Sequence, residues 1–379
     1  MRFNHRGHGV GRRKASGFGL QALGDRNSSR RAAEFVSPPR QRWEKWINIA
    51  ERQWRGTVLA HTLPCWTTSV RASAAQSRIQ LAHEALNCRR RARGELLHRV
   101  SFETGGNLLD AMIKNGVSSG FGDEWIRFGA TSEHTADGSF SERTMAMSQP
   151  YEGTNPPYKG NITETQEDLN AWAERVQRAG IQPNCHANGD VAIDMVLTAY
   201  ERAQQAAPRP DVRPKITHCT LINDDLLRRM KALGAVPAPF TTYAYYNTDK
   251  FHFYGEERMK RCMAYRSFFD AGIRAAAGSD FSPGPFAALM GIQGMVTRTG
   301  WNGETWGANQ RISVDEALQV NTINGAYNSH EEAIKGSITA GKLADFVVLA
   351  DDPHTVSKEK IKDIEIVRTV TGGSTVYHK

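Results

Sequence analysis

NCHANGD, residues 184–190, is the stretch that decides the fold of this chain. It places His186 directly after a short run of small and apolar residues, where a buried strand would end. ITH repeats this arrangement with His218, and GSD repeats it with Asp280. Catalytic groups at the C-terminal ends of several parallel strands meet at one rim of a barrel. The two imidazoles and the carboxylate are therefore candidate ligands of one metal ion, since this donor set suits zinc.

Helix-like segments separate these strand ends. They cover residues 190–206 and 223–233, and Gly234 follows the second one as a candidate C-cap. With strands predicted at 183–186 and 215–218, the order is strand, helix, strand, helix, which is typical of parallel βα units. Each metal candidate taken singly is more often a structural residue, so the interpretation depends on their joint placement. We therefore expect an α/β fold.

The same alternation extends from about residue 95 onwards. We expect further strands at residues 97–103, 125–134, 234–240 and 274–278, and further helices at residues 107–115, 168–179, 286–298 and 313–321. The last helix begins with Ser313 as N-cap and has Glu316 three residues later, which is the pattern of a capping box. Residues 145–160 are rich in proline, glycine and tyrosine and predict a long loop over the site.

The C-terminal tail changes character. After a turn at Gly341, residues 343–349 predict a buried strand. Residues 364–377, interrupted by two glycines, predict a β-hairpin. A barrel of parallel strands should not end on three such strands, so we expect them to form a small separate sheet.

Composition places the chain among globular proteins. Its 379 residues, of which 40% are hydrophobic and 23% charged, suffice for one large α/β barrel or two ordinary domains. No run approaches the roughly 18 apolar residues of a transmembrane helix, and the start has no apolar signal region. The five cysteines lie far apart without a CxxC pair, which argues for a reducing compartment such as the cytoplasm. Cys185 and Cys219 should point away from the barrel interior, because neighbours on a strand alternate faces.

The net charge of +8 is concentrated at the front of the chain. Residues 1–100 contain 20 lysines and arginines against 6 aspartates and glutamates, and 18 of those 20 are arginine. Three interpretations stay open: a disordered basic tail, an arginine- and serine-rich transit peptide, and an N-terminus that does not belong to the fold. We favour the third. Nucleic-acid binding is the least supported alternative, because the segment lacks aromatic–basic interleaving and a fold signature.

Further motifs occur along the chain in the same order as in one known family. The chain resembles the amidohydrolase superfamily, in particular the amidohydrolase family 3 branch that includes N-substituted formamide deformylase-like enzymes. The resemblance covers roughly residues 90–379. Besides the segments around His186, His218 and Asp280, it rests on these motifs: DGS at 137–139 with RT at 143–144, YRS at 265–267 with DAG at 270–272, TINGA at 322–326, KGS at 335–337 and GKLAD at 341–345.

The resemblance implies a TIM-type (β/α)8 barrel of metal-dependent hydrolases, with a small β-sandwich built from both chain ends. His186 then corresponds to the metal ligand of strand 5, His218 to that of strand 6, and Asp280 to the residue of strand 8. The strand-4 position, often a carbamylated lysine in this family, is Glu133 here, and its carboxylate would serve directly. The alternative is an ordinary exposed glutamate at a strand end.

The activity implied is metal-dependent hydrolysis of a non-peptide carbon–nitrogen bond in a small amide-type substrate. A divalent metal, with zinc favoured by the donor set, would activate water. Asp280, a metal ligand as well, would accept the proton of that water and pass it to the leaving amine. Arg143 and Arg266 are candidate substrate contacts. The expected partner is a small molecule, with no nucleic acid and no membrane, and a homodimer stays open.

One family feature is missing from the front of the chain. No His-x-His, the strand-1 metal pair of the family, occurs in residues 1–100. We therefore expect a basic segment unlike the family at 1–92, a partial barrel at 93–334 and a C-terminal β segment at 335–379. Our hypothesis is a barrel that is incomplete at the N-terminus through truncation. The alternative function is an inactive remnant without a complete metal site, because affinity depends on ligand count and geometry.

Overall fold

The computed structural model describes residues 86–281 and 284–379. These residues all belong to one compact unit. Most of the basic segment predicted at 1–92 lies outside the described residues. The predicted divisions between the three parts of the chain stay predictions.

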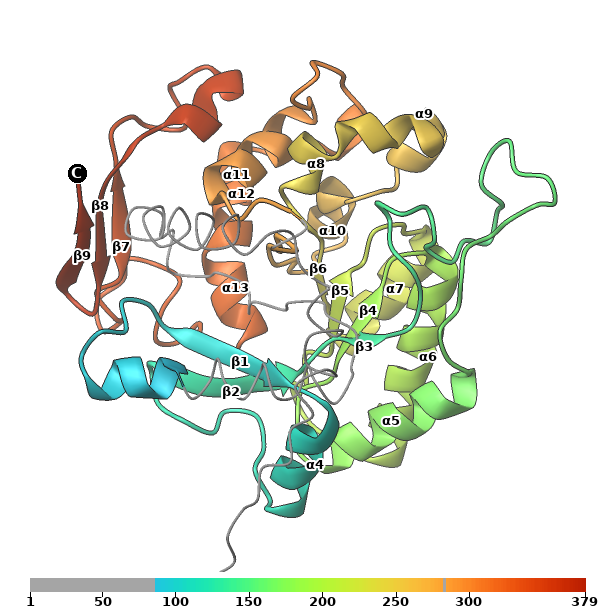
Figure 1. Cartoon of the computed structure of the whole chain (residues 1–379), viewed down its shortest axis with the longest axis horizontal. Coiled ribbons are helices and arrows are strands. Elements are labelled where there is room, and N and C mark those ends of the chain that lie inside the picture. Colours follow the sequence, from blue (N-terminus) through green and yellow to red (C-terminus); the bar gives the residue numbers. More distant parts are fainter. Residues whose placement is uncertain (1–85, 282–283) are drawn as a thin grey trace, which may run out of the picture. The chain divides into compact units, whose positions relative to one another are not determined.

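Parallel strands make up the main sheets of this unit (Figure 1). They are β1 (Val100–Thr104), β2 (Ile126–Thr131), β3 (His134–Thr135), β4 (Asn184–Ala187), β5 (Lys215–His218) and β6 (Val236–Ala238). β1 pairs with β2, and β3 to β6 pair in chain order, all in parallel. A parallel bridge between Ala130 and Gln182 joins the two groups. Strands of one direction with helices between them confirm the α/β prediction.

The prediction of a regular strand at 274–278 is wrong. The segment runs beside β6, where Ala276 N and Gly278 N donate to the carbonyl oxygens of two prolines at 2.9 and 3.0 Å. Those prolines, Pro237 and Pro239, have no N–H to donate in return, so a ladder with bonds in both directions cannot form. One parallel bridge, at Gly278, remains. The extended segment 274–278 nevertheless lies beside β6 as the next parallel element after it.

Helices follow most of the strands, and their ends agree with the local sequence. They are α4 (Gly106–Lys114), α5 (Gln166–Arg178), α6 (Asp190–Ala206), α7 (Asp224–Leu233), α8 (Tyr243–Tyr246), α9 (Gly255–Met259), α10 (Tyr265–Asp270), α11 (Ala288–Thr297), α12 (Val314–Asn321) and α13 (Ile323–Asn328), with 3-10 turns η1 (Thr248–Phe253), η2 (Ala308–Gln310) and η3 (Lys358–Asp363). Gly234 ends α7 in the left-handed conformation, and Ser313 with Glu316 forms the predicted capping box on α12. In the described part of the chain, no helix combines the length and apolar character needed to span a membrane.

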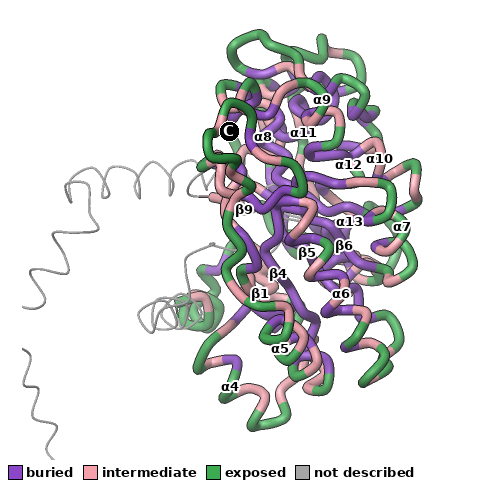
Figure 2. Tube along the Cα trace, turned by 90° about the vertical axis from the view of Figure 1, so that its right-hand side faces the viewer, coloured by how far each residue is buried: buried purple, intermediate pink, exposed green. Residues whose placement is uncertain are grey.

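The largest hydrophobic core lies between the strands and the helices that follow them. Ile216 of β5 belongs to it, together with Val196 of α6 and Leu226 of α7. Figure 2 shows buried chain along β4, β5 and β6. Cys185 and Cys219 are fully buried members of this core, which confirms that both thiols point away from the barrel interior.

The tail forms a separate antiparallel sheet, as predicted (Figure 1). Its strands are β7 (Phe346–Leu349), β8 (Ile366–Thr371) and β9 (Ser374–His378), with β8 in the middle. Gly372 and Gly373 both have positive φ and close the predicted hairpin. The prediction that residues 343–349 are buried is wrong, because Asp345 alone in that stretch is buried and Val348 is 41% exposed. A sheet that packs one face on the core leaves alternate side chains outside.

A buried ion pair ties the tail to β1. Arg99 donates from Nε and Nη2 to the two carboxylate oxygens of Asp345 at 2.7 and 3.1 Å. The two side chains are only 4% and 1% exposed. Asp345 also accepts from Gly372 N at 2.6 Å, and Thr371 Oγ1 donates to Leu97 O at 3.1 Å. Charge and backbone groups together therefore fix the tail sheet to the first described strand.

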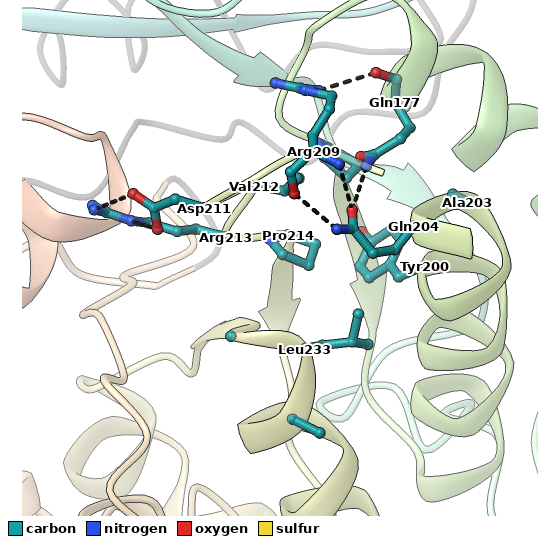
Figure 3. A pocket seen from close by; sticks show the side chains of 13 residues that line it. Gln177, Tyr200, Ala203, Gln204, Arg209, Asp211, Val212, Arg213, Pro214 and Leu233 are labelled. Carbon is teal, nitrogen blue, oxygen red and sulfur yellow. Dashed lines mark hydrogen bonds and ion pairs between the residues drawn. The ribbon is translucent and has the colours of Figure 1, made fainter. Parts of the chain in front are cut away.

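A cavity of about 160 Å³ lies where β4, β5 and β6 begin (Figure 3). The polar side chains that line this cavity form hydrogen bonds with one another and with the backbone. Gln177 Nε2 donates to Gln204 Oε1 at 2.6 Å, and Arg209 Nη1 donates to Ile181 O at 3.1 Å. The active sites of (β/α)8 barrels lie at the opposite ends of the strands. We therefore interpret this cavity as structural.

Candidate metal centre

Glu133, which directly precedes β3, meets His186 of β4 and His218 at the end of β5. In the register of β4 and β5, Thr217 lies opposite His186, so these two side chains share a face. Simple alternation would turn the next residue, His218, to the other face. His218 has φ 69, in the left-handed region. This departure from strand geometry brings its ring to the side of His186.

The three side chains form a compact cluster. Glu133 Oε1 lies 3.1 Å from His186 Nδ1 and 3.1 Å from His218 Nε2. The two imidazole centroids are 4.2 Å apart, with the rings at 70°. All three side chains are buried, at 5–8% exposed. One donor atom of each lies within 4.8 Å of the others, so a single ion could contact all three.

The donor atoms fit a divalent metal. Ligands of a tetrahedral zinc ion stand about 2.0–2.1 Å from it and so about 3.4 Å from one another. His218 Nε2 is buried and has no hydrogen-bond partner among the described residues, although Glu133 Oε1 is near. His186 Nε2 lies 3.0 Å from Gly138 O, a carbonyl that can accept a hydrogen bond from this nitrogen and so leave Nδ1 to ligate a metal. A ring that donates from one nitrogen and ligates with the other is the common state of a metal-bound histidine.

The electrostatics of the cluster also favour a cation. Burial lowers the pKa of His186, but the Glu133 carboxylate and the more distant Asp137 outweigh burial and raise it to about 9. Burial raises the pKa of Glu133, and the two imidazoles more than reverse this, so that the carboxyl stays ionised well below its usual range. Glu133 therefore attracts positive charge at this point, as a proton on His186 or as a metal ion.

Asp137 fixes the long loop to the end of β4. Its Oδ2 accepts from Ala146 N at 2.8 Å and from Gly189 N at 2.9 Å, and its Oδ1 accepts from Asn188 N at 2.9 Å. Burial raises the pKa of Asp137, whereas the three amide donors favour the carboxylate. A Cβ on Gly189 would lie 1.8 Å from Ala146 O, so only glycine allows this close approach. Asp137, the first residue of the DGS motif, therefore orders the surroundings of His186.

Asp280 lies outside the cluster of donor atoms. It is not one of the residues whose donor atoms lie within 4.8 Å of one another. Its Oδ2 accepts from Tyr243 Oη at 2.5 Å, and its φ is 51. The ring of Phe240 lies between the two regions, 4.1 Å from the His218 ring and 5.2 Å from the Tyr243 ring. Asp280 is thus linked to the histidines through Phe240 and Tyr243.

The two arginines predicted as substrate contacts differ in their surroundings. Arg266 lies on α10, where Nη1 donates to both oxygens of Glu316 and Nε donates to Asp270. These bonds occupy its guanidinium. Arg143 instead lies against aromatic rings, with Cζ 4.3 Å from the centroid of Phe253, and the described residues offer it no ion pair.

A buried polar network beside the histidines has no counterpart among the sequence predictions. Lys215 forms an ion pair with Glu103, and both side chains are at most 4% exposed. Asn184 Nδ2 donates to Glu103 Oε2 at 2.9 Å, and Thr217 Oγ1 donates to Asn184 Oδ1 at 2.8 Å. One sequence feature could have indicated this network: side chains alternate along a strand, so Asn184 lies on the same face as His186.

Comparisons with known proteins agree with this architecture. The model of the amidohydrolase family matches residues 10–377. The YtcJ protein of Bacillus subtilis (strain 168) is 29% identical over 262 residues, which are 67% of this chain and 48% of that protein. N-substituted formamide deformylase of Arthrobacter pascens is 27% identical over 236 residues, which are 62% and 43% of the two chains. The chain thus spans about half the length of the curated relatives it matches.

Solved structures bear on the fold. An uncharacterized metal-dependent hydrolase from Pyrococcus horikoshii has a TM-score of 0.64 at 23% identity, over 73% of this chain and 55% of that chain. This likeness confirms the predicted fold class of metal-dependent hydrolases. The family match begins at residue 10, inside the segment 1–92 that we expected to be unlike the family. Since the family model matches nearly the whole sequence, the chain belongs to the amidohydrolase family.

Proposed function

We propose that this chain is a metal-dependent hydrolase that cleaves a carbon–nitrogen bond, other than a peptide bond, in a small amide-type molecule. The observation that carries the proposal is Glu133 Oε1, which lies 3.1 Å from both His186 Nδ1 and His218 Nε2. Three buried donors facing one point suit a divalent cation, and imidazole with carboxylate favours zinc. The formamide deformylase among the relatives supports the amide-type substrate.

We assign the site residues the following roles. Glu133, His186 and His218 would hold the metal, which supplies a water whose pKa is lowered to about 7 when the metal is zinc. Asp280 is the proposed general base, which takes the proton of the water and then protonates the leaving nitrogen. Tyr243 Oη donates a hydrogen bond to Oδ2 of Asp280 at 2.5 Å. The other carboxylate oxygen, Oδ1, is therefore the one that would accept the proton of the water. The ligand role of Asp280 stays a prediction.

The proposed setting is the cytoplasm, with a small molecule as the partner. Cys185, Cys219 and Cys262 are buried free thiols, which supports a reducing compartment. The homodimer stays a prediction.

The second candidate is an inactive remnant of such an enzyme. The observation that favours it is the absence of a His-x-His from residues 1–100. A metal held by three ligands instead of five or six would bind more weakly, because affinity follows ligand count and geometry. Measured zinc content and turnover distinguish the two candidates.

The test uses the full chain reconstituted with zinc. Elemental analysis should find about one zinc per chain, and the loaded protein should release amine from members of a panel of N-formyl and N-acyl amines. Asp280→Asn should keep the metal and lose at least about 100-fold in kcat. Dipeptides in the same panel check the class of bond. Zinc below about a tenth of an equivalent, or no turnover of any substrate, would favour the inactive remnant.

A further inference from the structure

Arg143 has a strained backbone conformation. Its φ of 57 lies in the left-handed region, which non-glycine residues adopt infrequently. His218, at φ 69, and Asp280, at φ 51, share this conformation. Such residues persist only where the surrounding structure fixes them, and they cluster at functional sites. The chain has other residues of this kind, so the assignment of a role needs the contacts as well.

The guanidinium of Arg143 has no carboxylate partner among the residues that the structure describes. Its Cζ lies 4.3 Å from the ring centroid of Phe253 and 5.9 Å from that of Tyr151. Its Nε is buried and has no hydrogen-bond partner within the described ranges. The neighbouring Glu142 is exposed and forms no ion pair with it. Arg143 is therefore a cation over the ring of Phe253, within 6 Å of Tyr151, and its Nε donor has no partner among the described residues.

Two other arginines show what a structural role looks like in this chain. Arg213 donates from Nη1 and Nη2 to the two carboxylate oxygens of Glu332 at 3.0 and 2.7 Å. Arg266 donates from Nη1 to both oxygens of Glu316 at 2.7 and 2.9 Å. Leaving a buried donor without a partner costs stability, and within the described ranges Arg143 lacks the carboxylate partner that these two arginines have.

The turn that carries Arg143 adjoins the proposed metal centre. Arg143 N donates to Phe140 O at 3.2 Å. Gly138, just before this turn, has its carbonyl oxygen 3.0 Å from His186 Nε2. The ring of Phe140 lies 6.4 Å from that of Tyr243, which bonds the proposed base. The turn therefore contacts the surroundings of both the metal ligands and the base.

We infer that Arg143 binds a carboxylate of the substrate, which makes the substrate class amides that bear a carboxylate group, such as N-acyl amino acids. The inference rests on the proposed function and narrows it. A guanidinium presents a planar set of N–H donors that matches a carboxylate in two parallel bonds. A cation–π contact with Phe253 uses the face of the guanidinium and leaves its N–H edge available.

Binding tests the inference without any turnover. The probes are acetate, benzoate and N-acetylglycine, each paired with its neutral primary amide and titrated calorimetrically into full chain whose metal has been removed. Wild type should bind at least one carboxylate at least about 30-fold more tightly than the matched amide, and Arg143→Gln should abolish that preference. Arg228→Gln, which removes an exposed arginine of α7, should retain it. Equal binding of acid and amide by wild type, or unchanged preference in Arg143→Gln, overturns the inference.

Turnover supplies the second readout. If the zinc-loaded chain hydrolyses N-acyl amines, Arg143→Gln should raise KM for carboxylate substrates by at least about 30-fold and change kcat and KM for neutral analogues less than about threefold. Arg143→Lys should recover part of the lost carboxylate preference, because lysine restores the positive charge but not the pair of parallel N–H donors. Equal losses on both substrate types would mean a structural role and would overturn the inference. Carboxylate binding that depends on Arg143 without any turnover would reject the proposed function and keep the carboxylate site.

Discussion

Glu133 has two imidazole nitrogens within 3.1 Å and is itself buried, so it is the main local source of attraction for a cation. Glu133→Gln preserves the shape of the side chain and removes its charge. We expect zinc affinity to fall by at least about 100-fold, since changes one shell further from a metal already cost about 10–100-fold. Competition titration with a chromophoric zinc chelator measures the change.

Glu164→Gln is the matched control. Glu164 also contacts a histidine, His134, at 2.8 Å, but it lies outside the donor cluster. Its replacement should leave zinc affinity within about twofold of wild type. Equal zinc affinity in Glu133→Gln and Glu164→Gln would remove Glu133 from the ligand set.

At the level of single residues, the sequence predicts what local pattern determines. His186 and His218 stand out because a metal-competent side chain after a short apolar run is a local feature. The contact of Tyr243 with Asp280 joins residues 37 apart, and no spacing rule marks it. The orientation of His218 also depends on a positive φ that the residue type does not suggest.

Among the elements, β1 and β5 are joined by the buried pair of Glu103 and Lys215, whose side chains are 2% and 4% exposed. Lys215→Met leaves the Glu103 charge buried without this partner, and we expect the free energy of unfolding to fall by about 3–5 kcal/mol. Combining it with Glu103→Gln, which keeps an oxygen for Asn184, should recover more than half of the loss. Urea denaturation of the single and double variants measures the coupling.

The surface pair of Arg178 and Glu174 on α5 provides the comparison, with side chains 57% and 43% exposed. Replacing either member should change the free energy of unfolding by less than about 1 kcal/mol. If Lys215→Met were as mild as these substitutions, the buried pair would contribute nothing to joining the strands.

His354 links the tail segment to α12 in a manner that depends on pH. Its Nε2 lies 2.9 Å from Asp315 Oδ1 and its Nδ1 lies 2.7 Å from Asp352 Oδ1. Bonds to Asp315 and Asp352 raise the pKa of His354 above the ordinary 6.5. The stabilisation is therefore fully present below pH 6.5 and is lost as the pH rises through the folded-state pKa.

We expect His354→Gln to be less stable than wild type at about pH 5.5 and equal to it at about pH 9. Urea denaturation at both pH values gives the two differences. In a background of Asp315→Asn and Asp352→Asn the pH-dependent difference should disappear. A difference that grows with pH would mean that the sign of the linkage is wrong.

The elements also show where sequence patterns stop being informative. Residues 190–206 were predicted as a helix and α6 is Asp190–Ala206, because apolar spacing along one segment is sufficient for that prediction. The strand at 274–278 failed for a reason that lies in another strand, where Pro237 and Pro239 cannot donate. The burial of 343–349 failed because the face that a sheet turns to the core is set by its packing, which the segment itself does not encode.

For the molecule as a whole, the ion pair of Arg99 and Asp345 holds the tail sheet in place. Asp345→Asn leaves the Arg99 guanidinium buried without a charged partner, and we expect a loss of about 3 kcal/mol in the free energy of unfolding. Amides of β7, β8 and β9 should exchange hydrogen faster than in wild type. Glu365→Gln, which removes a surface partner of Lys379, is the control and should leave the exchange unchanged.

The Arg99–Asp345 pair joins residues 246 positions apart. A ribosome that adds about 5–20 residues per second needs roughly 12–50 s to synthesise that interval. During this time β1 has left the ribosome while the carboxylate that neutralises Arg99 does not yet exist. The nascent chain therefore keeps β1 without this charged anchor until Asp345 has been synthesised. Synonymous codons that slow translation between the two residues would lengthen this period and increase the exposure of the nascent chain to chaperones and proteases.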